Sequence, residues 1–291
     1  MPKTARYVTL AANVTPRLLA RPWAPKPRVR FRRMKIYRDL EYVKKRKRMA
    51  TLSAVAGVAL LGSAFWAATA AGPAAVLVAY LPLLAGTIIF HLGMQQVGKW
   101  NRAQRNDVIL DALLKDLGDR YTLVHYAKLG KRVVEHALIY PGGVLAITTK
   151  EVPGEVSYRP SEVSGRDGRW RKVGQGLSRF FGMGGPQVGN PTGEAATDVQ
   201  ALESTLAAEH LEADVDAVVA FVNPQVRLDV IEPDFPVTNA EGLRPYIASL
   251  PADPTLQSAE RQRLLELLLR EGSFELPQAT PTRRPVKRRA A

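Results

Sequence analysis

The sequence predicts an α/β domain with a mixed sheet, preceded by a transmembrane α-helical hairpin. The hairpin follows from one run, residues 50–94, that contains no Asp, Glu, Lys or Arg. Its 45 residues are enough for two bilayer crossings of about 20 residues each. The α/β domain follows from residues 100–250, where short apolar strand patterns alternate with amphipathic helical ones.

The uncharged run divides at Gly72-Pro73, where a helix is expected to break. We therefore expect two transmembrane helices over 51–71 and 74–94 within a membrane segment at 49–96. Small residues on the first helix would let the two helices approach closely; these are Ala54, Gly57, Ala64 and Ala68. A buried hairpin in a soluble protein is the alternative, but it would carry a polar face.

The excess positive charge lies at the N-terminus. The chain has a net charge of +14, and residues 1–48 hold 16 Lys or Arg against two acids, Asp39 and Glu41. This basic N-terminal arm ends in KKRKR at 44–48 and would lie against the lipid membrane, each cation contributing about 1 kcal/mol near an anionic surface. An Arg-rich, acid-poor arm also fits a transit peptide.

Positive charge sets the expected orientation. KKRKR precedes the first helix and Lys99 follows the second, whereas the connecting turn is uncharged. By the positive-inside rule, we expect an integral protein of the cell membrane with both termini cytoplasmic.

Helical and strand patterns follow one another through the domain at 100–250. The expected elements are helix 105–118, strands 121–126, 133–140, 143–149, 154–160 and 168–173, helix 193–210, strands 216–222, 226–231 and 236–239, and helix 240–249. The strands from 133–140 to 168–173 are expected to form one meander. An amphipathic C-terminal helix is expected within 251–272, and a disordered basic tail over 273–291.

Several kinds of chemistry are disfavoured by composition. The chain has no cysteine, which excludes disulfides and thiolate catalysis. Its histidines have no pair at metal-ligand spacing, which argues against a zinc site; they are His91, His125, His136 and His210. The Gly-rich segment 174–190 lacks both a preceding strand and a Gly-Lys-Ser/Thr sequence, so it is not a phosphate-binding loop.

One strand ends in a lysine after a glycine turn: GVLAITTK, residues 143–150. The period of two in a strand puts Thr148 and Lys150 on one face, whereas Glu151 points away. A lysine at such a strand end is either an ordinary exposed residue or part of a site.

The order of short motifs supports the site. They are Asn106-Asp107 at a helix start, Val134-Glu135-His136 on a strand, Ile147-Thr148-Thr149-Lys150 at the end of the next strand, Gly154 beyond it, and Asn190-Pro191 before a helix. Over about residues 103–225 this order resembles the nuclease-related domain (NERD) family, which has the restriction-endonuclease-like PD-(D/E)xK fold. The chain departs from the family's pattern at each of the acidic positions: Asn106-Asp107 stands where the family has Gly-Glu, and Val134-Glu135-His136 where it has Ile-Asp-His. Thr148 replaces the acid of the next strand, and Glu194 replaces a glutamine.

The resemblance implies metal-dependent phosphodiester cleavage. Glu135 and Asp107 would be the carboxylate ligands of Mg²⁺ or Mn²⁺. Lys150 would neutralise developing charge. Thr148 is a neutral, weak ligand, so the resemblance implies a degraded site with weak metal binding. Whether Glu155 or Glu194 supplies the missing acid stays open at this stage.

The sequence therefore supports two alternative functions. One is a membrane-anchored, nuclease-related protein that associates with DNA or RNA at the cytoplasmic face, where the strand Arg169-Trp170-Arg171 offers a basic and aromatic contact. The other is a non-enzymatic membrane scaffold that binds protein partners through an inactive nuclease fold. A third class, a soluble nucleic-acid binder, is disfavoured by the uncharged run at 50–94.

Overall fold

The computed structural model describes residues 33–70, 75–102, 104–161, 168–173, 187–253 and 256–275, all within one unit, Phe31–Ala291. The expected helix break at Gly72-Pro73, most of the Gly-rich segment at 174–190 and nearly all of the basic tail lie outside these residues.

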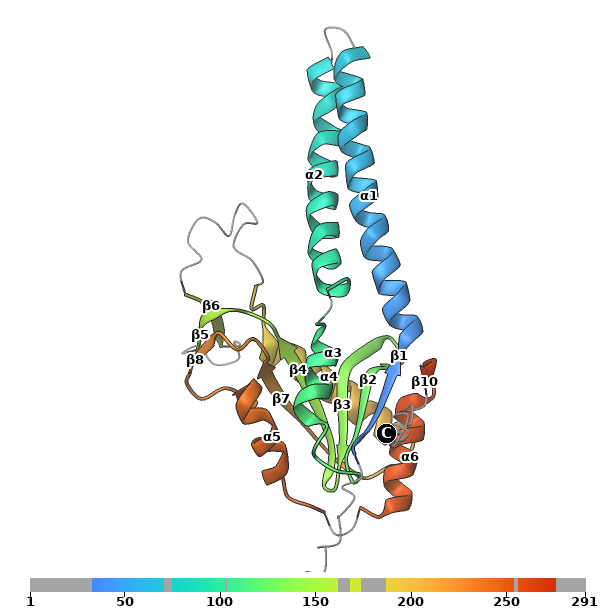
Figure 1. Cartoon of the computed structure of the whole chain (residues 1–291), viewed down its shortest axis with the longest axis vertical. Helices are drawn as coiled ribbons and strands as arrows, with labels where there is room; N and C mark the ends of the chain where they lie inside the picture. Colours follow the sequence, from blue (N-terminus) through green and yellow to red (C-terminus); the bar gives the residue numbers. More distant parts are fainter. Residues whose placement is uncertain are drawn as a thin grey trace, which may run out of the picture. The chain divides into compact units, whose positions relative to one another are not determined.

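Two long helices, α1 (Leu40–Ala70) and α2 (Ala75–Trp100), run side by side (Figure 1). Both are long and apolar enough to cross a membrane, over Leu40–Thr69 and Val78–Trp100. Helix α1 starts before the KKRKR run, because the side chain of Asp39 accepts a hydrogen bond from the backbone N–H of Tyr42 at 2.9 Å and caps the helix. The helices therefore extend further toward the domain than their sequence patterns predict.

Glycines hold the two helices close together. A Cβ at Gly57 would clash with the backbone of Phe90, and one at Gly93 would clash with the backbone of Ala54. Gly57 and Ala64 are buried, which confirms their predicted role, whereas Ala68 is exposed and that prediction is wrong. Close backbone approach maximises the van der Waals contact on which helix pairs in lipid depend.

Among the residues that the structure describes, the central sheet is mixed, as predicted, and has seven strands. Their order is β10 (Phe274–Glu275), β1 (Lys35–Asp39), β2 (Thr122–Leu129), β3 (Arg132–Tyr140), β4 (Gly143–Lys150), β7 (Asp214–Phe221) and β9 (Val237–Asn239). Strand β3 pairs antiparallel with both β2 and β4, and β7 pairs parallel to β4. Strand β1 lies within the basic arm and was not expected; it pairs parallel to β2.

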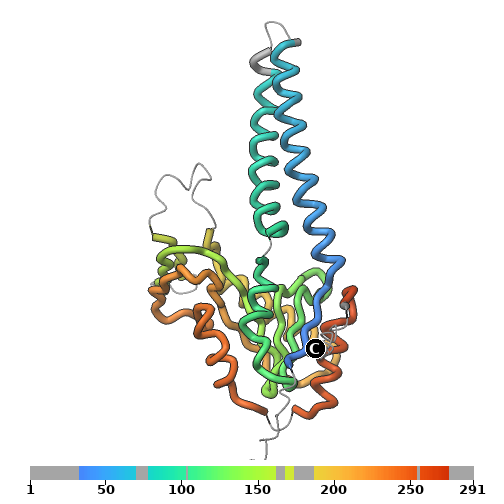
Figure 2. The backbone as a smooth tube through the Cα atoms, in the orientation of Figure 1, coloured from blue at the N-terminus to red at the C-terminus, as the bar shows by residue number. Residues whose placement is uncertain are grey.

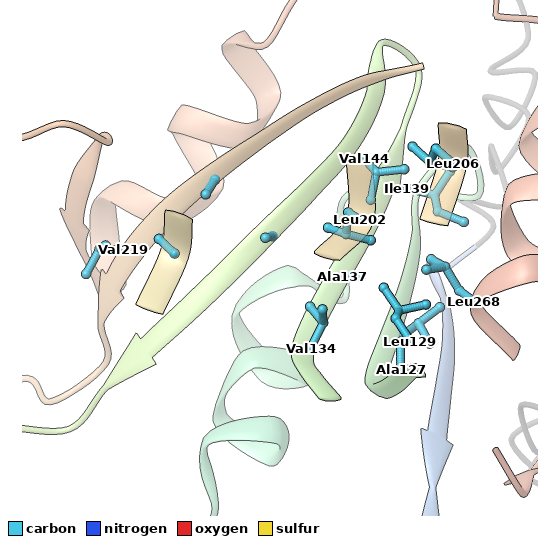
Figure 3. Close-up of a cluster of buried hydrophobic side chains, with 14 of the residues drawn as sticks. Ala127, Leu129, Val134, Ala137, Ile139, Val144, Leu202, Leu206, Val219 and Leu268 are labelled. Carbon is cyan, nitrogen blue, oxygen red and sulfur yellow. The ribbon is translucent and has the colours of Figure 1, made fainter. Parts of the chain in front are cut away.

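Helices cover both faces of the sheet. On one face lie α3 (Asn106–Leu114) and α5 (Ala240–Ser249), and on the other lie α4 (Pro191–Ala208) and α6 (Ser258–Leu269). Figure 3 shows the core on the α4 side, where Leu202 and Leu206 of α4 meet Ile139 and Val144 of the sheet. The tube in Figure 2 follows the chain from α2 into α3 and then through the antiparallel strands.

The expected single meander is wrong beyond β4. Strand β5 (Gly154–Arg159) leaves the central sheet and forms a second sheet with β6 (Arg169–Lys172) and β8 (Val226–Val230). The edge of β4 that β5 would have used is paired with β7. Gly154 has φ +88°, a conformation that favours glycine, and it turns the chain away.

Candidate functional site

The four predicted site residues lie at one end of the central sheet, but they belong to two faces. Lys150 ends β4, and Asp107 lies in the first turn of α3. A hydrogen bond from Asn106 Nδ2 to Thr149 Oγ1 (2.9 Å) joins the start of α3 to the end of β4. We call the side with α3 the network face and the side with α4 the ion-pair face.

On the ion-pair face, Lys150 is held by Glu194. Its Nζ donates to Oε1 of Glu194 at 2.6 Å, and its side chain is 15% exposed against 48% for Glu194. Asn190 positions this acid by capping α4, since its Oδ1 accepts the N–H of Gly193 at 3.1 Å. Glu155 lies instead on exposed strand β5, so Glu194 is the acid that reaches the lysine.

Thr148 shares the strand face of Lys150 but makes no comparable contact. The residue is 5% exposed, and its Oγ1 has no hydrogen-bond partner within the part of the chain that the structure describes. A buried hydroxyl without a partner costs about 1–3 kcal/mol. The position that the resemblance assigns to an acid is therefore polar, buried and unpaired.

Glu135 on β3 forms an ion pair with a lysine of the α1–α2 helical hairpin. Lys99, in the last turn of α2, approaches Oε1 of Glu135 at 2.7 Å. Burial is the largest influence and favours the protonated carboxyl, but the charge and hydrogen bond of Lys99, with His136 and Lys150, together outweigh it, so the pKa of Glu135 is lowered. This acid is therefore ionised, and its charge is already balanced.

A further buried acid, Asp198, completes the ion-pair face. Arg132 donates to it at 2.8 Å, and the residue is 5% exposed. Burial raises the pKa of Asp198 to about 6, opposed by Arg132 and helped by the charges of Glu135 and Glu194. Sequence reasoning missed Asp198, although its spacing of four from Glu194 places both on one side of a helix.

Asp107 is completely buried on the network face. Its Oδ2 lies 2.8 Å from Nε of Arg38 and 2.8 Å from the guanidinium of Arg105. Burial raises the pKa of Asp107, but the hydrogen bonds of Arg105 and the charge of Arg38 reverse this, so the pKa is lowered overall. The carboxylate is enclosed by two cations and has no open side.

Two histidines continue this buried network across the strands. His125 Nε2 lies 2.8 Å from Asp111 Oδ1, and His125 Nδ1 lies 2.7 Å from His136 Nδ1. His136 Nε2 lies 3.2 Å from Thr149 Oγ1. Burial lowers the pKa of His136 to about 3, so the ring is neutral.

One arrangement of hydrogens satisfies every member. The hydroxyl of Thr149 accepts from Asn106 and donates to His136, whose Nδ1–H donates to His125, whose Nε2–H donates to Asp111. The pairing of these histidines could not be predicted from the sequence, because only the β2–β3 register brings them opposite each other.

Trp170 does not offer its ring to a ligand. It is 9% exposed, packs against Tyr158 and Phe221, and donates from Nε1 to Thr192 Oγ1 at 3.2 Å. The flanking Arg169 and Arg171 are exposed. Of the expected contact for nucleic acid, only the two arginines are therefore accessible, and the aromatic ring is not.

Comparison with known proteins gives no match: no protein-family model, curated protein or solved structure is significantly similar to this chain. Within the described residues, no group of three or more His, Cys, Asp or Glu side chains is placed to hold a metal ion.

Proposed function

We propose that this chain is a membrane-anchored, non-catalytic binding module built on a restriction-endonuclease-like domain of the nuclease-related kind. One observation carries the proposal: the carboxylates at the end of the central sheet are each paired with a cation of the chain. The pairs are Glu135 with Lys99, Glu194 with Lys150, Asp198 with Arg132, and Asp107 with Arg38 and Arg105.

The fold part of the proposal rests on element order. Helix α3, the antiparallel strands β2, β3 and β4, helix α4 and the parallel strand β7 follow one another as the resemblance leads one to expect. Lys150 at the end of β4 and Glu135 on β3 then fall where that resemblance would put site residues.

The donor set does not fit Mg²⁺ or Mn²⁺. Such an ion needs one or two carboxylates with free oxygens. Glu135 is ion-paired with Lys99, Asp107 is enclosed on the network face, and Thr148 supplies no charge. We therefore assign no metal-dependent step to these residues.

Membrane anchoring and orientation complete the proposal. Helices α1 and α2 would cross the cell membrane, leaving both termini and the domain on the cytoplasmic side. A domain anchored at the membrane is suited to recruit protein partners, and the ion-paired acids favour this scaffold function over hydrolysis.

Association with DNA or RNA is a second candidate. Arg159, Arg169 and Arg171 line a hollow of about 440 Å³ on the outer face of β5 and β6. Glu155 and Asp229 line it too, which reduces its attraction for a polyanion. Gel-shift titration of DNA and RNA tests this: Arg169→Gln with Arg171→Gln should weaken binding, whereas equal binding by the variant would contradict it.

The cleavage test requires the full chain in detergent, because β1 belongs to the sheet and a fragment starting near residue 100 would lose that strand. Plasmid DNA and RNA would be incubated with millimolar Mg²⁺ or Mn²⁺ and the wild type, Lys150→Ala or Lys131→Ala. We expect none of the three proteins to cleave DNA or RNA more than the buffer alone does. Cleavage by the wild type and Lys131→Ala that disappears in Lys150→Ala would overturn the non-catalytic proposal.

A further inference from the structure

The ends of α1 and α2 that join the domain lie at one level. Gly93 of α2 packs against Ala54 of α1. In an antiparallel pair, six residues further toward the domain on each helix are Arg48 and Lys99. The KKRKR run and the last turn of α2 therefore share one height along the hairpin.

Exposed cations gather at this height. We call Lys44, Lys45, Arg46, Arg48 and Lys99 the basic collar. Among the described residues, the four collar cations of α1 form no ion pair, and Arg46 instead lies over the ring of Tyr42 at 5.1 Å. Acids close by in sequence are engaged elsewhere: Asp39 caps α1, and Glu41 accepts a hydrogen bond from Ser273.

The collar also stands at the height of lipid headgroups. Beyond Arg48, residues 49–70 of α1 span about 33 Å at about 1.5 Å per residue, which matches the roughly 30 Å of a bilayer's hydrocarbon core. Next to the collar, the ring of Trp100 lies 5.9 Å from that of Tyr42 and 5.7 Å from that of Tyr126. Trp100 and Tyr126 are each 4% exposed, so this ring cluster joins the collar end of the hairpin to β2.

We propose that the basic collar is a binding site for the phosphate groups of anionic phospholipids, and that Lys99 is shared between lipid phosphate and Glu135. The proposal rests on the membrane anchoring proposed above. Unpaired cations at headgroup depth attract anionic lipid. Lys99 is 46% exposed beside Glu135, so a lipid phosphate reaches it from the open side.

The shared lysine connects the lipid surface to the candidate site. When lipid phosphate draws Lys99 away, Glu135 loses the partner that balances its charge. Removing the carboxylate therefore frees Lys99 for lipid, and removing the lysine takes one cation from the collar. The two substitutions change lipid preference in opposite directions, which no general loss of structure would do.

The test measures lipid selectivity in vesicles that mix phosphatidylcholine with phosphatidylglycerol, one of the two brominated. Bromine quenches nearby tryptophan, and Trp23→Phe with Trp66→Phe leaves Trp100 as the reporter at the collar, since Trp170 belongs to β6 of the second sheet and packs against Tyr158 and Phe221. Relative binding constants follow from the two quenching curves. About fivefold preference per cation is the scale expected near an anionic surface.

We expect the parent to favour phosphatidylglycerol at least about fivefold, and the collar variant to lose most of that preference; that variant carries Lys44→Gln, Lys45→Gln, Arg46→Gln and Arg48→Gln. A control that removes the same charge from exposed domain positions should keep the preference; it carries Lys131→Gln, Arg227→Gln, Arg244→Gln and Arg263→Gln. Lys99→Gln should lower the preference, and Glu135→Gln should raise it.

Other outcomes separate the proposals. Resistance to alkaline carbonate extraction is scored first, because a chain that is extracted overturns membrane anchoring itself. An inserted chain with no preference for phosphatidylglycerol, or with equal losses in the collar and control variants, overturns the lipid site alone. If the preference for phosphatidylglycerol changes in the same direction in Glu135→Gln and Lys99→Gln, the proposal that Lys99 is shared is overturned.

Discussion

The two faces of the sheet end use charge in different ways. On the network face, Asp107, His125 and His136 are completely or almost completely buried and every polar partner is supplied by the chain. On the ion-pair face, Lys150 meets a half-exposed Glu194, and Thr148 has no partner among the described residues. The network face is built for stability, whereas the ion-pair face keeps groups that can exchange partners.

The largest effect should come from Asp107→Ala. This change leaves Arg38 and Arg105 without their buried carboxylate. Removing one partner of a buried ion pair costs about 3–5 kcal/mol. Denaturant titration of the full chain in detergent measures the loss of unfolding free energy; a loss below about 1 kcal/mol would contradict the structural role of the network.

Two adjacent threonines test the difference between the network face and the ion-pair face, because Thr149 points to the first and Thr148 to the second. Thr149→Val removes the contacts with Asn106 and His136 and should destabilise by about 1–3 kcal/mol. Thr148→Val removes an unpaired hydroxyl and should be neutral or stabilising.

Thermal unfolding of the two valine variants side by side checks this difference. They match in volume and strand propensity, so each serves as the other's control. Equal destabilisation would contradict this expectation, because it would mean that the hydroxyl of Thr148 has a hydrogen-bond partner in the folded protein.

The faces should also respond to pH in opposite ways. The folded-state pKa of His136 is about 3, below its ordinary 6.5, so only the unfolded chain takes up this proton and stability falls as pH drops from 6.5 toward 3. The pKa of Asp198 is about 6, above its ordinary 3.8, so the folded chain is protonated first and stability rises as pH falls from about 6 to 3.8.

Asp198→Asn separates these two contributions. Each group changes stability by at most about 1.4 kcal/mol per pH unit. Without the aspartate, unfolding free energy measured from pH 6.5 to 4 should fall more steeply than in the wild type. Parallel curves for the two proteins would mean that Asp198 does not oppose the histidine.

Glu194→Gln should have the smallest effect on stability. The partner of Lys150 is 48% exposed, and solvent screens such a pair, so the loss should stay below about 1 kcal/mol and shrink further in salt. Unfolding titrations at low and high ionic strength measure both properties. A loss of several kcal/mol that persists in salt would place this pair in the same class as Asp107.

Local patterns predicted most of the fold. The uncharged run marked α1 and α2, and the alternation around residues 121–149 marked β2, β3 and β4. Strand β1 escaped prediction because its residues are charged and its pairing partner β2 is far along the chain. Strand β5 was placed in the wrong sheet, because the parallel pairing of β4 with β7 is not local.

Less of the candidate site could be predicted. The strand period correctly separated Lys150 from Glu151, which pairs with Arg102 instead. The partners of Glu135 and Asp107 were not foreseen, since Lys99 lies between the expected membrane segment and the domain, and Arg38 lies in the arm. Ion pairing across segments depends on the assembled fold and leaves no periodic signal in the sequence.

At the end of the central sheet, the charges of the acids are already balanced by cations of the same chain. Titration of the full-length protein with Mn²⁺, followed by electron paramagnetic resonance of the free ion, tests it most directly. We expect the free-ion signal to stay at its full value up to millimolar Mn²⁺. A saturable loss of signal that Glu135→Gln abolishes would contradict the account and restore the metal site.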